Sequence, residues 1–320
     1  MGPTFFVSSG AFLGWSLGAN DASNAFGVAV ATRVIKFSIA VTLCAIFVII
    51  GALADGHAGI QNLGDYAFSS GVRSGIAAFL VMLSAGLTVT LMTVISMPIS
   101  TSQCVIGSII GWGLAYGMAD FSKTVKFVNA WVLTPIGAMV ICFVLCHIAR
   151  KFLPGRVMQL WLFEHIVRAG YYIAGIFSAY SLGANNVANV TGIYVGAIGI
   201  LEPFWAVLIG GISIAAGVLT YSKKVMYTVG SRITELSPLT GVLAILSSSI
   251  AVYFYAIVGI PVSTSQAVVG AVIGAGLANG ASTVNFAMVR NIFVAWFGTP
   301  AIAGIITWSM AMGYQTLTQS

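Results

Sequence analysis

Long apolar stretches dominate the chain, and polar side chains gather at only a few places within them. Three stretches contain no Asp, Glu, Lys or Arg, at 74–119, 169–201 and 236–289. Each stretch is longer than the roughly 20 residues that one membrane-spanning helix needs. Several helical spans must therefore follow one another, joined by uncharged turns.

The hydrophobic pattern predicts five helical spans in each half of the chain. The expected spans are about 4–30, 37–54, 74–96, 98–118 and 128–148, then about 170–196, 204–221, 237–258, 261–280 and 288–311. Any of these segments could instead be a re-entrant hairpin, which enters and leaves the membrane on the same side. The fold class that we expect is an all-α polytopic membrane protein.

Composition agrees with a protein that has lipid as its solvent. Of the 320 residues, 59% are hydrophobic and only 6% are charged, whereas soluble domains carry about 25% charged residues. The mean hydropathy is +1.02. The formal net charge of +6 would suit a nucleic-acid partner, but the basic residues lie in loops between apolar spans. We therefore expect a lipid bilayer and no nucleic acid around this chain.

The chain contains an internal duplication. Three motifs recur in the same order at a shift of 163 or 165 residues, which chance seldom produces. The pairs are GANDASNAFG at 18–27 with GANNVANVTG at 183–192, MPISTSQCVIGSIIGWG at 97–113 with IPVSTSQAVVGAVIGAG at 260–276, and WVLTP at 131–135 with WFGTP at 296–300. We expect a first repeat at 1–149, a short linker at 150–168 and a second repeat at 169–320.

Charge predicts how the two repeats are oriented. An odd number of spans per repeat inverts the second copy relative to the first. With the 150–168 linker in the cytoplasm, ten basic residues fall inside: Arg33, Lys36, Arg150, Lys151, Arg156, Arg168, Lys223, Lys224, Arg232 and Arg290. Three fall outside, namely Arg73, Lys123 and Lys126. This split places both termini outside. Because Arg33 is the first basic residue, the basic region of a cleavable signal peptide is missing.

The first repeated motif places polar groups inside an apolar span. Asp21 and Asn24 are three residues apart, as are Asn186 and Asn189 in the second copy, so each pair shares one helix face. Unpaired polar groups in hydrocarbon are costly, so these side chains should face the protein interior. A single Gly-Ala-Asn-Asp is usually only a turn, but its recurrence in both repeats favours a binding site.

The second repeated motif predicts a helix that begins inside the membrane. Pro98 and Pro261 should interrupt or start a helix, and Ser-Thr-Ser-Gln follows each of them, at 100–103 and 263–266. Such a helix start presents free backbone N–H groups and a partial positive charge, which attract an anion. One such motif is usually only a helix cap. Two of them, related by inverted symmetry, could face one anion from two sides.

Enzymatic chemistry finds little support in the sequence. The three histidines lie outside the repeated motifs, and no metalloprotease or phosphate-binding loop motif is present. The four cysteines indicate neither a disulfide nor a metal site. Asp21 is the only acid in the repeated motifs. An acid beside an anion site is repulsive unless a cation lies between them, which favours co-transport with Na⁺.

These motifs resemble the inorganic phosphate transporter (PiT) family of sodium- or proton-coupled carriers. The resemblance covers nearly the whole chain and includes KKVMYTVGSRITEL at 223–236. It implies an inverted-repeat symporter with broken helices and re-entrant hairpins around a central phosphate, often as a homodimer. The short 150–168 linker is similar to that of prokaryotic members, so the resemblance implies a prokaryotic plasma (inner) membrane.

The resemblance carries binding roles onto matching residues. The implied phosphate ligands are Ser100, Thr101, Ser102, Gln103, Ser263, Thr264, Ser265, Gln266, Asn24 and Asn189. The implied sodium ligands are Asp21, Asn20, Asn24, Asn185, Asn186 and Asn189. Na⁺ is then the coupling ion, and no other cofactor is expected.

Two departures from the family pattern bear on coupling. Many members carry Asp in both GAN motifs, but here the second motif has Asn185 and Asn186. Many members also have His where this chain has Gln103 and Gln266, and losing two titratable groups favours sodium over protons. A proton-coupled phosphate, metal-phosphate or sulfate carrier of the same fold stays open as the alternative. An anion channel is a more distant one, because paired polar breaks suit alternating access better than a continuous pore.

Overall fold

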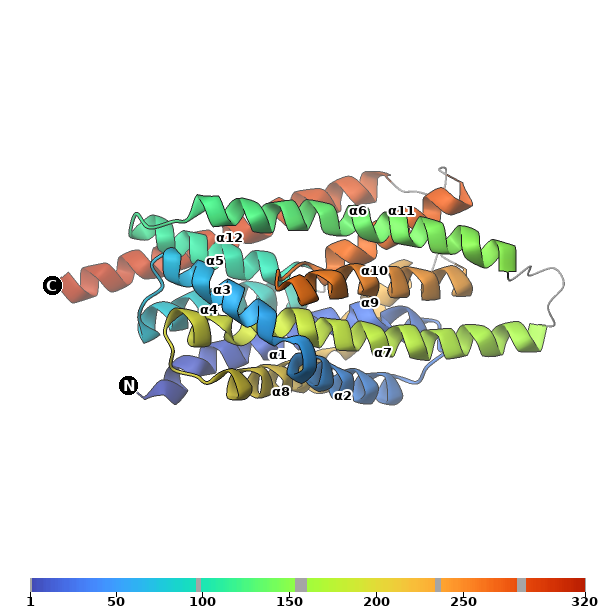
Figure 1. Ribbon diagram of the computed structural model, residues 1–320, viewed down its shortest axis with the longest axis horizontal. Helices are drawn as coiled ribbons and strands as arrows, with labels where there is room; N and C mark the ends of the chain where they lie inside the picture. The colour runs from blue at the N-terminus through green and yellow to red at the C-terminus, as the bar shows by residue number, and fades with distance from the viewer. Residues whose placement is uncertain (1, 96–98, 153–159, 234–236, 281–285, 320) are drawn as a thin grey trace.

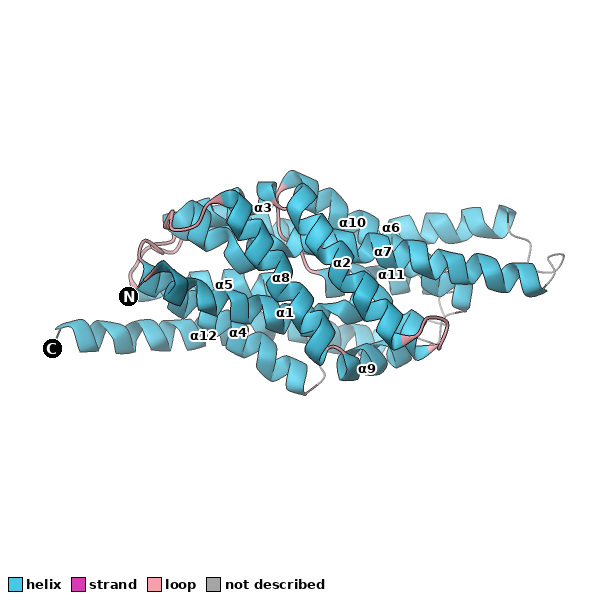
Figure 2. Ribbon diagram, turned by 90° about the horizontal axis from the view of Figure 1, so that it is seen from below, coloured by secondary structure: helices cyan, strands magenta, loops and turns pink. Residues whose placement is uncertain are grey.

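The computed structural model describes residues 2–95, 99–152, 160–233, 237–280 and 286–319. Nearly all of these residues are helical, and no strand occurs among them (Figure 2). The helices of the first half are α1 Pro3–Ala31, α2 Phe37–Asp55, α3 His57–Ser69, α4 Gly75–Val94, α5 Thr101–Ala115 and α6 Phe121–Phe152. Those of the second half are α7 Leu160–Gly192, a π-helical turn η1 Ile193–Ala197, α8 Pro203–Tyr221, α9 Lys223–Ile233, α10 Pro238–Val258, α11 Thr264–Asn279 and α12 Phe286–Gln319.

The apolar pattern predicted most of these helices, and several of them are long enough to span a membrane. Five of the described helices, α2, α4, α6, α8 and α10, are long and apolar enough to cross a membrane. The chain is therefore an integral, multi-pass membrane protein. The linker expected at 150–168 is partly helical, since α6 ends at Phe152 and α7 begins at Leu160, and the residues between them lie outside the described part.

Two helices were missing from the sequence prediction. Figure 1 shows α2 ending in the middle of the molecule and α3 continuing toward the end that holds both chain termini. Similarly, α9 follows α8 directly after Ser222. The predicted spans 37–54 and 204–221 are therefore each only the first part of a crossing, which a break divides into α2 and α3 in one case and α8 and α9 in the other. The reason is composition: α3 carries Asp65, and α9 begins with Lys223 and Lys224, so neither is strongly apolar.

Two pairs of predicted spans are hairpins. In Figure 1, α4 and α5 lie in the half with the chain termini, and α10 and α11 lie in the opposite half. The 15 residues of α5 and the 16 of α11 extend only about 22–24 Å at 1.5 Å per residue, short of a hydrocarbon core about 30 Å thick. The hairpins therefore enter from opposite ends, and the starts of α5 and α11 lie near the middle.

Close helix contacts repeat across the two halves. A Cβ at Gly18 in α1 would collide with the backbone oxygen of Ile214 in α8, and one at Gly183 in α7 would collide with that of Val48 in α2. Likewise, α5 packs on α12 and α6 packs on α11. Each repeat thus packs its helices against the opposite repeat in the same way. The protein is built from two inverted-topology repeats.

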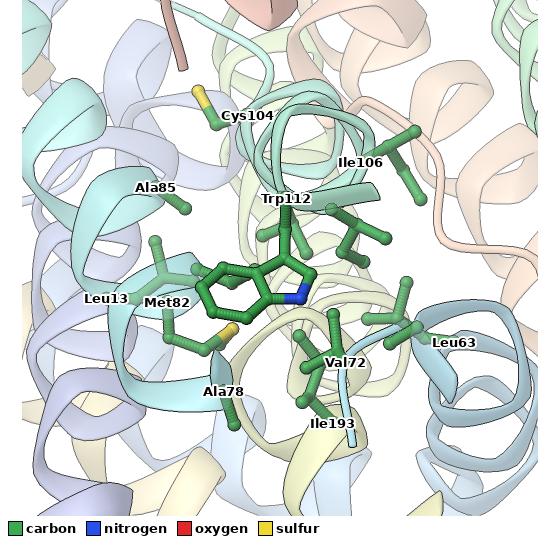
Figure 3. Packing of buried hydrophobic residues seen from close by; sticks show 14 of the residues in the cluster. Leu13, Leu63, Val72, Ala78, Met82, Ala85, Cys104, Ile106, Trp112 and Ile193 are labelled. Carbon is green, nitrogen blue, oxygen red and sulfur yellow. The ribbon is translucent and has the colours of Figure 1, made fainter. Parts of the chain in front are cut away.

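A buried apolar cluster holds α5 in position. Trp112 of α5 lies against Leu13 of α1 and Met82 of α4, with Val72 and Ile193 nearby (Figure 3). The Trp112 indole N–H donates to the Gly71 carbonyl oxygen at 3.1 Å. This packing fixes the helix whose first turn carries the Ser-Thr-Ser-Gln motif.

Candidate functional site

The residues assigned from sequence converge at the middle of the molecule. Each of them is buried: Asn20, Asp21, Asn24, Ser100, Thr101, Ser102, Gln103, Asn185, Asn186, Asn189, Ser263, Thr264, Ser265 and Gln266. They come from the middle of α1, from the last turns of α7 and from the first turns of α5 and α11. We refer to this set as the central site.

Both short helices begin with the same cap. The Ser100 hydroxyl accepts from the Gln103 backbone N–H at 3.3 Å, and the Ser263 hydroxyl accepts from that of Gln266 at 3.2 Å. A serine in this position satisfies one of the free N–H groups of a helix start. Pro261 lies in the extended segment before α11, as expected, and Pro98 lies outside the described residues.

The two hairpins are bonded to each other at this point. The Ser102 hydroxyl donates to the Val262 carbonyl at 2.9 Å, and the Ser265 hydroxyl donates to the Ile99 carbonyl at 3.0 Å. Asn185 of α7 binds Val262 twice, donating to its carbonyl at 2.8 Å and accepting from its N–H at 3.0 Å. These bonds bring the starts of α5 and α11 together across the repeat boundary.

The long helices reach the hairpins through side chains. From α1, Asn24 donates to the Thr264 hydroxyl at 3.0 Å, and that hydroxyl donates to Asp21 Oδ2 at 3.2 Å. From α7, the Asn189 amide donates to the Ser102 hydroxyl and to Asn186 Oδ1, each at 3.0 Å. Thus α1 contacts α11, and α7 contacts α5.

Asn20 of α1 bonds to α4 rather than to the starts of α5 and α11. Its amide donates to the Thr93 hydroxyl of α4 at 3.0 Å, a partner that sequence reasoning missed because Thr93 lies outside the repeated motifs. Asn20 thus connects α1 to the α4–α5 hairpin.

Several buried polar atoms at the central site lack a hydrogen-bond partner within the described part of the protein. They are Asp21 Oδ1, Thr101 Oγ1, Gln103 Oε1, Asn186 Nδ2, Asn189 Oδ1 and Gln266 Oε1. Buried polar groups are normally paired, so such a group calls for an explanation, such as a bound ion or ligand. Their concentration here fits a ligand at the junction of four helices.

The charge at the central site is simple. Asp21 is its only ionisable group, and within the described part of the chain no Lys, Arg or His belongs to it. Positive potential comes instead from the starts of α5 and α11, whose first N–H groups face the centre. No cluster of three His, Cys, Asp or Glu side chains occurs among the described residues.

A small cavity that sequence reasoning missed adjoins Thr264. Its volume is about 10 Å³, and its lining is Ser178, Ser181, Ser248, Ser249, Thr264, Val252 and Val268. This volume is close to the least that one water molecule needs. The Ser181, Ser248 and Ser249 hydroxyls donate to backbone carbonyls of their own helices, so their oxygen lone pairs remain free.

The opposite repeat has fewer hydroxyls at the equivalent positions. The capping serines Ser74 and Ser237 align α4 with α10 at a shift of 163 residues. Ser248 and Ser249 then correspond to Ala85 and Gly86. At the shift of 165 that relates α7 to α1, Ser178 corresponds to Leu13 and Ser181 to Ser16. Leu13 and Ala85 belong to the apolar cluster around Trp112. The second repeat therefore has three serines around this cavity, Ser178, Ser248 and Ser249, whose equivalents in the first repeat carry no hydroxyl.

Two inverted repeats, with hairpins and broken helices that meet at a buried polar centre, define a membrane transporter rather than an enzyme. The model of the phosphate transporter family matches residues 17–163 and again residues 162–307. The chain belongs to this family.

Individual relatives agree with the family match. A protein of Methanocaldococcus jannaschii named as a candidate phosphate permease is 32% identical over 297 residues, covering 92% of each chain. The sulfate permease CysP of Bacillus subtilis is 27% identical over 294 residues, covering 91% of this chain and 82% of its own. A solved structure described as the sodium-dependent phosphate transporter has the same fold, with a TM-score of 0.84 at 21% identity, covering 98% of this chain and 99% of that one.

Proposed function

We propose that this protein is a sodium-coupled symporter of inorganic phosphate that works by alternating access. The observation that carries the proposal is the junction of two inverted helix starts at a buried centre that, among the described residues, holds one carboxylate and no basic side chain. Family membership and the similarity to a sodium-dependent phosphate transporter support it.

Phosphate would bind between the first turns of α5 and α11. A helix start offers N–H donors and a partial positive charge, and the two hairpins bring these features together from opposite ends. Thr101 Oγ1 and Asn186 Nδ2 are unpartnered and able to donate to the anion. The 100–103 and 263–266 segments, with Asn24 and Asn189, form the proposed phosphate site.

Sodium would bind beside Asp21. A buried carboxylate is costly without a partner, and Asp21 Oδ1 has none among the described residues. Hard cations prefer oxygen ligands. Asn24 shares a face of α1 with Asp21, and Asn186 and Asn189 share a face of α7, so their amide oxygens are the proposed further ligands. The cation would screen Asp21 from the phosphate, so each ligand would favour binding of the other.

The hydroxyl-lined cavity supports this assignment. It lies beyond Thr264, whose hydroxyl donates to Asp21. Three of its serines donate their protons to backbone carbonyls and so present oxygen lone pairs to the cavity. Its volume suits a single water molecule or a small cation, and not an oxyanion. A cation could therefore approach Asp21 from this side.

Alternating access would use the inverted repeats. The hairpins enter from opposite ends and are held together by side-chain bonds at Ser102 and Ser265. Breaking the packing on one side while keeping it on the other would expose the centre to one face of the membrane at a time. We also propose a homodimer in a prokaryotic plasma membrane, with a cytoplasmic α6–α7 linker and both termini outside.

Sodium titration of phosphate binding tests the role of Asp21. Coupling between two ligands is reciprocal, so sodium should tighten phosphate and phosphate should tighten sodium by the same factor. Phosphate affinity is measured by calorimetry against sodium at several fixed pH values, in the wild type and Asp21→Asn. Asp21→Asn is expected to lose most of the sodium dependence.

Two results would contradict the assignment. If Asp21→Asn keeps the full sodium enhancement, then Asp21 is not a sodium ligand. If the wild type responds to pH and not to sodium, Asp21 carries a coupling proton, and the proton-coupled alternative is correct.

A further inference from the structure

Four basic side chains lie where two membrane-crossing helices have their ends. Arg33 and Lys36 belong to the turn between α1 and α2, and Lys223 and Lys224 are the first residues of α9, directly after α8. All four are exposed. Since α2 begins here and α8 ends here, and both helices are long enough to cross a membrane, these residues lie at one boundary of the membrane. We call them the basic patch.

Aromatic contacts join the two segments of the basic patch. The Lys223 ammonium lies 5.8 Å from the centre of the Phe37 ring, within the range of a cation–π contact. The same ring stacks on Tyr227 of α9, with 6.5 Å between the ring centres. Phe37 directly follows Lys36 in the sequence. The α1–α2 turn and the start of α9 therefore form one surface, although they belong to different repeats.

The segments that form the basic patch carry no acid. The stretches 22–54 and 203–234 contain neither Asp nor Glu. On α7, which packs on α2, Glu164 is exposed, but it lies four residues before Arg168, so the two can pair on one helix face. The positive charge of the patch is therefore not offset within its own segments, and it is left for an anionic ligand.

Arg33 has a backbone conformation that side chains rarely adopt. Its φ is +60°, and no other described residue except glycine has a positive φ. The helices α2 and α8 are both 19 residues long, and aligning them at a shift of 166 residues pairs Arg33 with Gly199, whose φ is +61°. Glycine adopts this conformation without the steric cost that a side chain adds. The first repeat thus has an arginine where the second repeat has the residue that the backbone favours.

The equivalent positions at the other boundary carry no such charge. In the same alignment Lys36 corresponds to Glu202, and Lys223 and Lys224 correspond to His57 and Ala58. The inverted fold is therefore built at that end without a group of basic residues. The basic patch is a feature of one end of the molecule and not a requirement of the repeat.

We propose that the basic patch binds the headgroup of an anionic phospholipid. The phosphodiester would lie against the Arg33 guanidinium and the lysine ammonium groups, and the first N–H groups of α2, which have no side-chain cap, would donate to its oxygens. The surroundings favour a lipid over free phosphate, because Ile39, Leu219 and Tyr227 are 41%, 52% and 44% exposed beside the patch and offer an apolar surface to the acyl chains. Basic segments at a membrane boundary attract anionic headgroups in this way.

Lipid binding to the purified protein tests the inference. The protein in a nonionic detergent is titrated with short-chain phosphatidylglycerol or with short-chain phosphatidylcholine, and bound lipid is measured by native mass spectrometry. Each basic residue near an anionic headgroup contributes about fivefold in affinity, so phosphatidylglycerol should bind about 100-fold more tightly than phosphatidylcholine. Equal binding of the two lipids would overturn the inference and leave the proposed transport function standing.

Variants test the assignment to the basic patch. The double variant Arg33→Gly and Lys223→Gln removes two of its charges, and glycine suits the backbone at position 33. It should bind phosphatidylglycerol about 25-fold more weakly than the wild type. The double variant Arg73→Gln and Lys126→Gln is the control at the opposite end, where Arg73 also lies over an exposed ring, 4.9 Å from the centre of that of Phe68. An equal loss of binding in the two double variants would overturn the assignment.

Inorganic phosphate distinguishes a lipid site from a site for the free anion. Potassium phosphate and potassium chloride are added at equal ionic strength to the protein with bound phosphatidylglycerol, without sodium, so that the proposed coupling at the central site is not engaged. Both salts should displace the lipid equally, through screening alone. Displacement by phosphate at much lower concentration than by chloride would mean that the patch takes free phosphate and would overturn the lipid assignment. The comparison of the two lipids on the wild type decides the question even where a variant fails to fold.

Discussion

At the residue scale, serine hydroxyls perform two tasks at the central site. Ser100 and Ser263 cap helices, and Ser102 and Ser265 bond the hairpins to each other. Sequence alone predicted the caps, because Ser-Thr-Ser after proline is a local signal. The bonds between hairpins were not predictable, since their acceptors are backbone carbonyls that no side-chain pattern reports.

Replacing Ser102 or Ser265 with alanine should weaken phosphate binding. A hydrogen bond to a charged partner contributes about 1.5–3 kcal/mol, which is about tenfold or more in affinity. In addition, the hairpins lose a bond that holds the two helix starts together. Phosphate affinity by calorimetry is the measurement.

Ser84→Ala provides the matched control for these variants. The Ser84 hydroxyl also donates to a backbone carbonyl of the opposite repeat, that of Ala303 at 3.0 Å, but it lies outside the central site. We expect it to leave phosphate affinity unchanged. Unchanged affinity in both Ser102→Ala and Ser265→Ala would instead remove these segments from the site.

At the element scale, the apolar pattern predicted where most helices lie along the chain. It did not predict how far each helix extends across the membrane. The edges of α4 and α10 agree with the spans expected at 74–96 and 237–258. Hydropathy measures apolar content, so it cannot distinguish a hairpin arm from a full crossing. It also passes over α3 and α9, whose polar residues lower the signal. The serine cavity escaped notice because serines in apolar helices usually bond to their own backbone.

Helix contacts across the repeats should be sensitive to added volume. Gly183→Ala places a methyl group on the Val48 backbone oxygen, and such overpacking typically costs about 1–3 kcal/mol. Thermal unfolding of the purified protein should therefore shift to lower temperature. Gly313→Ala on α12 is the control, since a Cβ there meets nothing within 4 Å, and it should be neutral or slightly stabilising. Equal melting temperatures for both variants would contradict the packing described here.

At the scale of the whole molecule, the duplication in the sequence corresponds to the two inverted repeats. The motif pairs converge on one centre as the repeat symmetry predicts. One asymmetry could be anticipated, because only the first GAN motif has an aspartate. The other, the three additional serines around the cavity in the second repeat, required the alignment of α10 with α4 in the structure.

The orientation in the membrane follows from the charge distribution and stays a prediction. A single cysteine at position 155, in a background where Cys44, Cys104, Cys142 and Cys146 are replaced, should react with an impermeant thiol reagent only from the cytoplasmic side. A second probe at position 2 should react only from outside. Reaction of the position 155 probe from outside alone would reverse the orientation.

Sodium-driven uptake into proteoliposomes tests the central claim most directly. Vesicles containing the purified protein are given labelled phosphate, with sodium outside and potassium inside. The account predicts that phosphate accumulates above its external concentration, and that this accumulation disappears when potassium replaces the external sodium. Phosphate that merely equilibrates across the vesicle membrane, with or without sodium, would indicate a channel and contradict sodium-coupled transport.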